Sequence, residues 1–148
     1  MSEVVAAMPA KPHRFAVTVY WEDTDAAGIV YYANYLKFIE RARSDLVARA
    51  GIDQAALLER DGIVFPVRRC CIDYVQPARL GDQLSVSTEL RKLGGASVDL
   101  HQAVEREGET LARADIRLAC IGRDGRPLRL PSAVRQAFGA VQSALKGI

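Results

Sequence analysis

One stretch near the N-terminus, residues 22–35, decides the fold and reads EDTDAAGIVYYANY. Before it, residues 15–21 are mostly β-branched or aromatic, which predicts a first strand that ends at the acidic loop. After it, apolar residues recur at helical spacing from Asn34, the expected cap, to Ala50, and Gly51 ends the run. The sequence therefore predicts a strand, an acidic loop and a long, largely buried helix in immediate succession.

The rest of the chain has the pattern of a short helix followed by an antiparallel sheet. Residues 53–60 form the helical pattern, and four strand-like segments follow at residues 64–75, 83–93, 96–106 and 110–121, separated by glycine-containing turns. Pro131 and Ser132 then open a final amphipathic helix. This order predicts an α+β hotdog fold, a curved antiparallel five-stranded sheet wrapped around a long central helix.

Size and composition favour one domain. The chain has 148 residues, of which 49% are hydrophobic, enough for one core and few for two. Residues 1–13, rich in alanine and proline, predict a flexible tail before a single domain over residues 14–145.

The charges and cysteines limit the compartment and the partners. The 20 basic and 18 acidic residues are spread along the chain, which argues against a nucleic-acid or anionic-membrane partner. No window approaches the roughly 18 consecutive apolar residues of a membrane span. Three cysteines form neither a CxxC pair nor an even disulfide framework. We therefore expect a cytoplasmic protein without a transmembrane segment.

The acidic loop suggests a reaction. Asp23 and Asp25 precede Gly28 and the start of the long helix. A helix N-terminus has unpaired N–H groups and a partial positive charge, so it can stabilise an oxyanion. A carboxylate beside it can attack a carbonyl carbon directly or activate a water molecule. The combination predicts hydrolysis of an ester or thioester.

Further motifs are spaced along the chain in the same order as in one known family. They read FIERAR at residues 38–43, FPVR at 65–68, DY at 73–74 and PARLGD at 77–82. Together with the acidic loop, this set resembles the 4-hydroxybenzoyl-CoA thioesterase-like hotdog family over roughly residues 14–140. The resemblance is strongest to its branch of Tol-Pal-associated acyl-CoA thioesterases.

The resemblance implies a thioesterase for fatty or aromatic acyl-CoA that uses no cofactor. It implies a homodimer or homotetramer with active sites at subunit interfaces. Asp25 matches the family's catalytic aspartate, a nucleophile or a general base for water. The backbone N–H of Tyr32 matches the group that faces the thioester carbonyl. The Tol-Pal-associated branch often has histidine at this position, whereas the hydroxybenzoyl branch has tyrosine.

Substrate contacts are predicted at two places. Gly28 can let the backbone approach a ligand closely. Tyr31, Tyr32 and Tyr35 can line an acyl pocket, although aromatic residues at a helix start can also be core or interface. In the hydroxybenzoyl branch the nucleotide end of coenzyme A is held near the turn between the third and fourth strands. Here that region offers Arg91, Lys92 and Ser97 as candidates.

Other functions fit the sequence less well. The Asp23–Asp25 pair lacks the supporting acidic cluster of a hard-metal site, so no metal is predicted. A hotdog dehydratase would need a histidine on the central helix, which has none. His13 in the tail and His101 in a strand are expected at the surface or in packing. A non-catalytic module that binds an acyl thioester or an acyl carrier protein remains the alternative, and an acyl carrier protein is also a possible partner of the enzyme.

Overall fold

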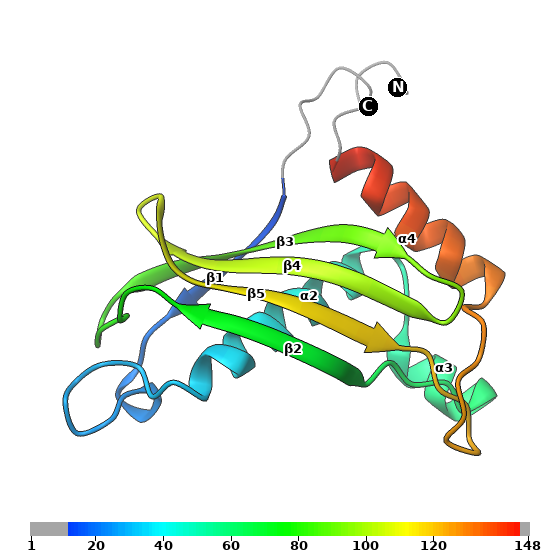
Figure 1. The fold of residues 1–148 in the computed structure, drawn as a ribbon, viewed down its shortest axis with the longest axis horizontal. Coiled ribbons are helices and arrows are strands. Elements are labelled where there is room, and N and C mark those ends of the chain that lie inside the picture. The colour runs from blue at the N-terminus through cyan, green and yellow to red at the C-terminus, as the bar shows by residue number, and fades with distance from the viewer. Residues whose placement is uncertain (1–11, 146–148) are drawn as a thin grey trace.

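The computed structural model describes residues 12–145 and contains one antiparallel sheet with helices (Figure 1). The elements in chain order are β1 (His13–Thr18), the 3-10 helix η1 (Trp21–Asp23), α2 (Asn34–Arg49), α3 (Gln54–Asp61), β2 (Val67–Tyr74), β3 (Gln83–Leu93), β4 (Ser97–Arg106), β5 (Glu109–Ala119) and α4 (Ser132–Leu145). The strand order is β1-β3-β4-β5-β2, so β3, β4 and β5 form a meander and β1 and β2 are the edges. The predicted α+β architecture is confirmed.

Helix α2 lies against one face of the curved sheet (Figure 1). Its buried side chains recur at helical spacing, and Phe38 and Ala42 are fully buried. Alternate residues of the strands complete the core from the sheet side, as Val98, Leu100 and Val104 of β4 do. No helix among residues 12–145 is both long and apolar enough to cross a membrane.

A buried polar network ties α2 to the sheet. The Gln102 side chain on β4 is fully buried, and its Nε2 donates to the Ile39 carbonyl at 2.8 Å and to Thr88 Oγ1 at 2.9 Å. Its Oε1 accepts a hydrogen bond from Arg43 at 3.3 Å. Because buried polar groups are costly when unpaired, this network fixes the position of the helix over the strands.

Helix α4 closes one end of the core. Phe138 of α4 is buried and meets Phe65 edge to face, with ring centroids 6.5 Å apart. Arg135 donates to the Gly94 carbonyl at 2.7 Å, which holds the helix to the turn between β3 and β4. This end of the molecule is therefore packed and closed by side chains of the chain itself.

Some local predictions need correction. The first strand ends at Thr18, because the backbone turns into η1 before the acidic loop. The cap of α2 is Ala33, and Asn34 is the first helical residue, with its side-chain amide donating to the Asp23 carbonyl at 2.9 Å. Residues 1–11 of the predicted tail lie outside the described residues. His13 belongs to β1, where its Nε2 lies 2.8 Å from an Asp45 oxygen on α2.

Candidate active site

The acidic loop folds back on itself as a small hairpin. Thr24 and Val30 form an antiparallel bridge, and the Asp25 N–H donates to the Ile29 carbonyl at 2.9 Å. The Gly28 N–H donates to the Asp25 carbonyl at 3.1 Å, and Gly28 has a positive φ of 78°. A side chain at this position would be strained, so glycine is needed for the tight return of the chain.

Asp25 is exposed at this hairpin, and one of its carboxylate oxygens is fixed. Oδ1 accepts a hydrogen bond from the Ala27 N–H at 2.8 Å, an Asx turn. Within residues 12–145 no hydrogen bond engages the other oxygen, Oδ2. The side chain borders a hollow of about 390 Å³ whose other lining residues are Trp21, Thr24, Ala26, Gly28 and Leu80. The carboxylate is thus oriented by the backbone and open to a ligand.

Asp23 has a different role from Asp25. Its Oδ2 accepts from the Tyr20 N–H at 2.8 Å, and its carbonyl accepts from the Tyr31 N–H at 3.0 Å and from the Asn34 side chain at 2.9 Å. The carboxylate of Asp23 therefore bonds the backbone at the start of η1, and its carbonyl holds the loop to the start of α2.

The start of α2 leaves a backbone donor open. The Asn34 N–H donates to the Tyr31 carbonyl at 2.8 Å and so orients the peptide that carries the Tyr32 N–H. That N–H has no partner within the part of the chain that the structure describes. No side chain among residues 12–145 caps the start of the helix. An exposed donor at the positive end of a helix can stabilise an oxyanion.

Two further tyrosines, Tyr35 and Tyr74, support this junction, and Tyr74 was not assigned to the site from the sequence. The Tyr35 hydroxyl accepts from the Ala78 N–H at 2.9 Å, and the Ala78 carbonyl accepts from the Val30 N–H at 2.8 Å. Tyr74 at the end of β2 donates its hydroxyl to the Tyr32 carbonyl at 3.0 Å. Burial raises the pKa of both phenols, so they stay protonated near neutral pH. The DY motif at residues 73–74 was the feature of the sequence that could have pointed to Tyr74.

The connection before β3 is held by charge. Asp82 accepts hydrogen bonds from the Arg79 N–H at 2.8 Å and from Arg106 at 2.7 Å. Burial would raise the pKa of Asp82, but these two hydrogen bonds and the positive charge of Arg106 hold it below its ordinary value. The same connection bonds to the acidic loop, because the Leu80 N–H donates to the Gly28 carbonyl at 3.3 Å.

The structure separates the other candidate ligand residues from Asp25. Thr18 pairs with Gln83 beside the loop, and Arg91 lies eight residues farther along β3, about 27 Å of extended strand. Figure 1 shows the loop and the far end of β3 at opposite ends of the molecule. Lys92 lies beside Arg91 on β3, and Ser97 begins β4 after the following turn. Gly28 therefore borders the same hollow as Asp25, and Tyr31 and Tyr32 follow in the same loop. One chain does not bring Arg91, Lys92 or Ser97 to Asp25.

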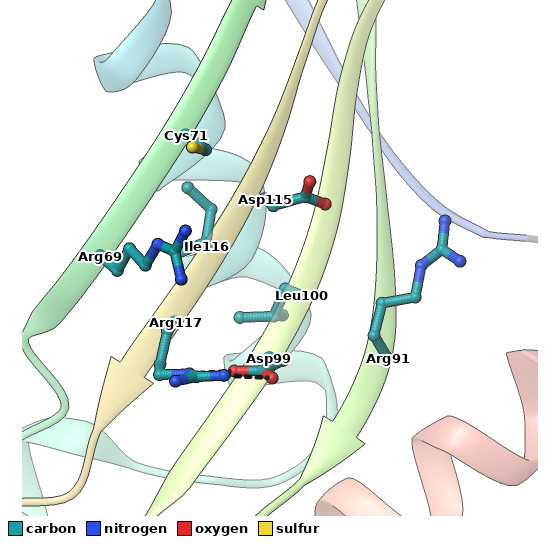
Figure 2. Close-up of a pocket in the computed structure, with 8 residues that line it drawn as sticks. All are labelled: Arg69, Cys71, Arg91, Asp99, Leu100, Asp115, Ile116 and Arg117. Atoms are coloured by element: carbon teal, nitrogen blue, oxygen red, sulfur yellow. Dashed lines mark hydrogen bonds and ion pairs between the residues drawn. The ribbon is translucent and has the colours of Figure 1, made fainter.

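Arg91 instead borders a hollow of about 300 Å³ on the face of the sheet away from α2 (Figure 2). Its guanidinium points away from the other labelled side chains and lies 3.3 Å from a Glu89 oxygen. Across the hollow, Arg117 donates to both Asp99 oxygens at 2.8 and 3.1 Å. His101 Nδ1 lies 2.8 Å from an Asp115 oxygen. These polar side chains pair with one another on the outer face.

Known proteins with the same fold share much of this sequence. The family model of the thioesterase-like superfamily matches residues 19–138. An acyl-CoA thioesterase, YbgC, of Haemophilus influenzae is 39% identical over 125 residues, which cover 84% of this chain and 92% of that protein. A 1,4-dihydroxy-2-naphthoyl-CoA hydrolase of Thermosynechococcus vestitus is 32% identical over 70% of this chain and 72% of its own length.

A solved structure agrees with these relatives. A thioesterase of Thermus thermophilus, complexed with coenzyme A and Zn, has a TM-score of 0.79 and 32% identity, covering 92% of this chain and 98% of that one. The matches confirm the predicted hotdog fold and the prediction of a thioesterase enzyme. Because the family model matches residues 19–138, a range that includes the acidic loop, the central helix and strands β2 to β5, the chain belongs to the thioesterase-like superfamily.

Proposed function

We propose that this protein hydrolyses the thioester of a fatty or aromatic acyl-CoA to the free acid and coenzyme A. The observation that carries the proposal is the junction of the acidic loop with α2. Within residues 12–145, this junction has a carboxylate oxygen of Asp25 and the N–H of Tyr32 without hydrogen-bond partners. A thioester needs an attacking group at its carbonyl carbon and a donor at its carbonyl oxygen. The junction offers both.

The reaction would proceed with the carbonyl oxygen held by the Tyr32 N–H. If Asp25 is the base, it removes a proton from water, the hydroxide adds to the carbonyl carbon, and the C–S bond breaks to release the thiolate of coenzyme A. If Asp25 is the nucleophile, its oxygen adds instead, and water hydrolyses the resulting mixed anhydride. The thiolate is a good leaving group, so a second acid is not required.

The relatives support acyl-CoA as the substrate class. The YbgC protein is named for acyl-CoA and the cyanobacterial hydrolase for an aromatic acyl-CoA, so both acyl types occur in similar chains. Gly28 and Tyr31 would contact the substrate near the thioester. Arg91, Lys92 and Ser97 would contribute if a second copy brought them to the site. The free cysteines at 70, 71 and 120 support a reducing, cytoplasmic location.

A homodimer or homotetramer would complete the site. The edge strand β2 is exposed along almost its whole length, and edge strands are ready to pair with another chain. Tyr32 and Tyr74 near the site are also exposed. We propose that a second copy covers this edge and these aromatic side chains. Sedimentation that finds only monomer at micromolar concentration would contradict this arrangement.

The first test is release of free thiol from a panel of short, long and aromatic acyl-CoAs, comparing the wild type with Asp25→Asn. We expect the substitution to lower kcat by about 10²–10⁴-fold without changing the melting temperature. Asp124→Asn is a matched control, because Asp124 also forms an exposed Asx turn, accepting from the Arg126 N–H at 3.0 Å. That variant should retain full activity.

The outcome also decides between the two classes of function. Near-normal hydrolysis by Asp25→Asn would reject the proposed mechanism. No thiol release by the wild type, together with saturable binding of acyl-CoA or of an acylated carrier protein, would favour the non-catalytic binding module. Release of free thiol from an acylated carrier protein but not from acyl-CoA would identify the carrier protein as the acyl donor, with the same hydrolysis of a thioester.

A further inference from the structure

Tyr74 contacts the start of α2 through both its ring and its hydroxyl, although 42 residues separate it from Tyr32. The hydroxyl donates to the Tyr32 carbonyl at 3.0 Å. The ring lies edge-on to Tyr32, with centroids 6.0 Å apart, and to Tyr35 at 5.4 Å. Edge strand β2 is thus attached to the residue that carries the open N–H.

This hydrogen bond changes how the helix begins. In a regular α-helix the Tyr32 carbonyl would accept from the N–H four residues later, that of Leu36. Here the Leu36 N–H donates to the Ala33 carbonyl at 3.2 Å, and the Tyr74 hydroxyl takes the Tyr32 carbonyl. The regular hydrogen bonding of the helix therefore does not extend to the Tyr32 carbonyl, which is bonded by Tyr74 instead.

Both peptides that flank Tyr32 are consequently held. The Asn34 N–H fixes the peptide before it through the Tyr31 carbonyl, and Tyr74 fixes the peptide after it. An oxyanion donor is effective because it is already oriented when charge develops. A donor whose two neighbouring peptides are clamped meets that requirement.

We propose that Tyr74 is a positioning residue, whose hydroxyl holds the Tyr32–Ala33 peptide so that the Tyr32 N–H points at the thioester carbonyl oxygen. The inference rests on the proposed function and adds a residue from a distant strand to that site. Tyr74 itself need not contact the reacting atoms. Its effect should therefore appear in the rate of the chemical step and not in ground-state binding of the acyl-CoA.

The test is Tyr74→Phe, which keeps the ring and removes only the hydroxyl. We expect kcat to fall about fivefold to tenfold, less than the ~10²–10³-fold cost of removing an oxyanion donor outright. We expect KM, and the Kd of a non-hydrolysable thioether analogue of acyl-CoA, to stay within about twofold of the wild type. Tyr20→Phe is the control, because the Tyr20 side chain is 66% exposed and takes no part in the contact between Tyr74 and Tyr32.

A second readout does not depend on hydrolysis. The backbone amide signals of Tyr32 and Ala33 in ¹⁵N-labelled protein should shift and broaden in Tyr74→Phe and remain unchanged in Tyr20→Phe. Unchanged amide signals, an unchanged kcat, or a parallel loss of kcat, analogue binding and melting temperature would each overturn the proposal. If the wild type releases no thiol but the amide signals move, the proposed function fails while the positioning of the peptide stands.

Discussion

The two ends of helix α2 differ in how completely the chain satisfies itself. At the C-terminal end, Leu46, Val47 and Ile52 are buried, and the N–H groups of Ala50, Gly51 and Ile52 return to carbonyls of the last turn. At the N-terminal end the Tyr32 N–H has no partner within residues 12–145, and Trp21 is 79% exposed. The closed end supplies stability, and the open end keeps polar and aromatic groups available for a ligand or a second chain.

Phe138→Ala should produce the largest loss of stability and tests the closed end. The side chain is buried against Phe65, so its removal leaves a cavity and should lower the free energy of unfolding by about 3–5 kcal/mol. The measurement is urea unfolding at neutral pH. Because Phe138 lies far along the core from Asp25, kcat per folded molecule should not change. A fall in kcat without a fall in stability would show that Phe138 at the closed end affects catalysis at the open end.

The fold could be predicted from the sequence because its signals are local. The apolar stripe from Tyr35 to Val47, the glycines after the helices and the turns between β3, β4 and β5 each follow from neighbouring residues. The hairpin at Asp25 is also local, since the backbone hydrogen bonds that close it join residues no more than eight positions apart.

The rest of the site depends on contacts between distant residues. Tyr74 contacts Tyr32, which is 42 residues away in the sequence, and His13 contacts Asp45, which is 32 residues away. The periodicity of apolar residues predicts neither pair. The distance from the loop to Arg91 is likewise set by the register of β1 on β3, which the composition of neither strand reveals. The cap of α2 was misassigned to Asn34 because its side chain bonds backward to the loop rather than to its own helix.

Asp82 should give a smaller, pH-dependent effect at the open end. Its pKa in the folded protein lies below its unfolded value, so its contribution to stability is present above the unfolded pKa, about 3.9, and is lost as pH falls through the folded pKa. Asp82→Asn should therefore lower the free energy of unfolding at pH 7 and reduce the loss of stability on acidification. Urea unfolding at pH 7, 5 and 3 measures both effects.

Asp99→Asn is the matched variant on the outer face. The Arg117 hydrogen bond outweighs burial and also holds the pKa of Asp99 below its ordinary value, so stability should respond to acid in the same direction. Asp99 is remote from the acidic loop, whereas Asp82 holds the connection that bonds to Gly28. Only Asp82→Asn should change kcat at pH 7. Equal kcat in the two variants would remove Asp82 from the support of the site.

Trp21→Ala should have the smallest effect on folding and gives the sharpest contrast with Phe138→Ala. An indole that is 79% exposed contributes little to the core of one chain, so the free energy of unfolding, extrapolated to low protein concentration, should change by no more than about 0.5 kcal/mol. Trp21 lines the hollow beside Asp25, so KM for acyl-CoA should rise. If stability instead falls only at protein concentrations where the wild type is dimeric, the indole is covered by a second copy rather than by substrate, and the open end of α2 is an interface between chains.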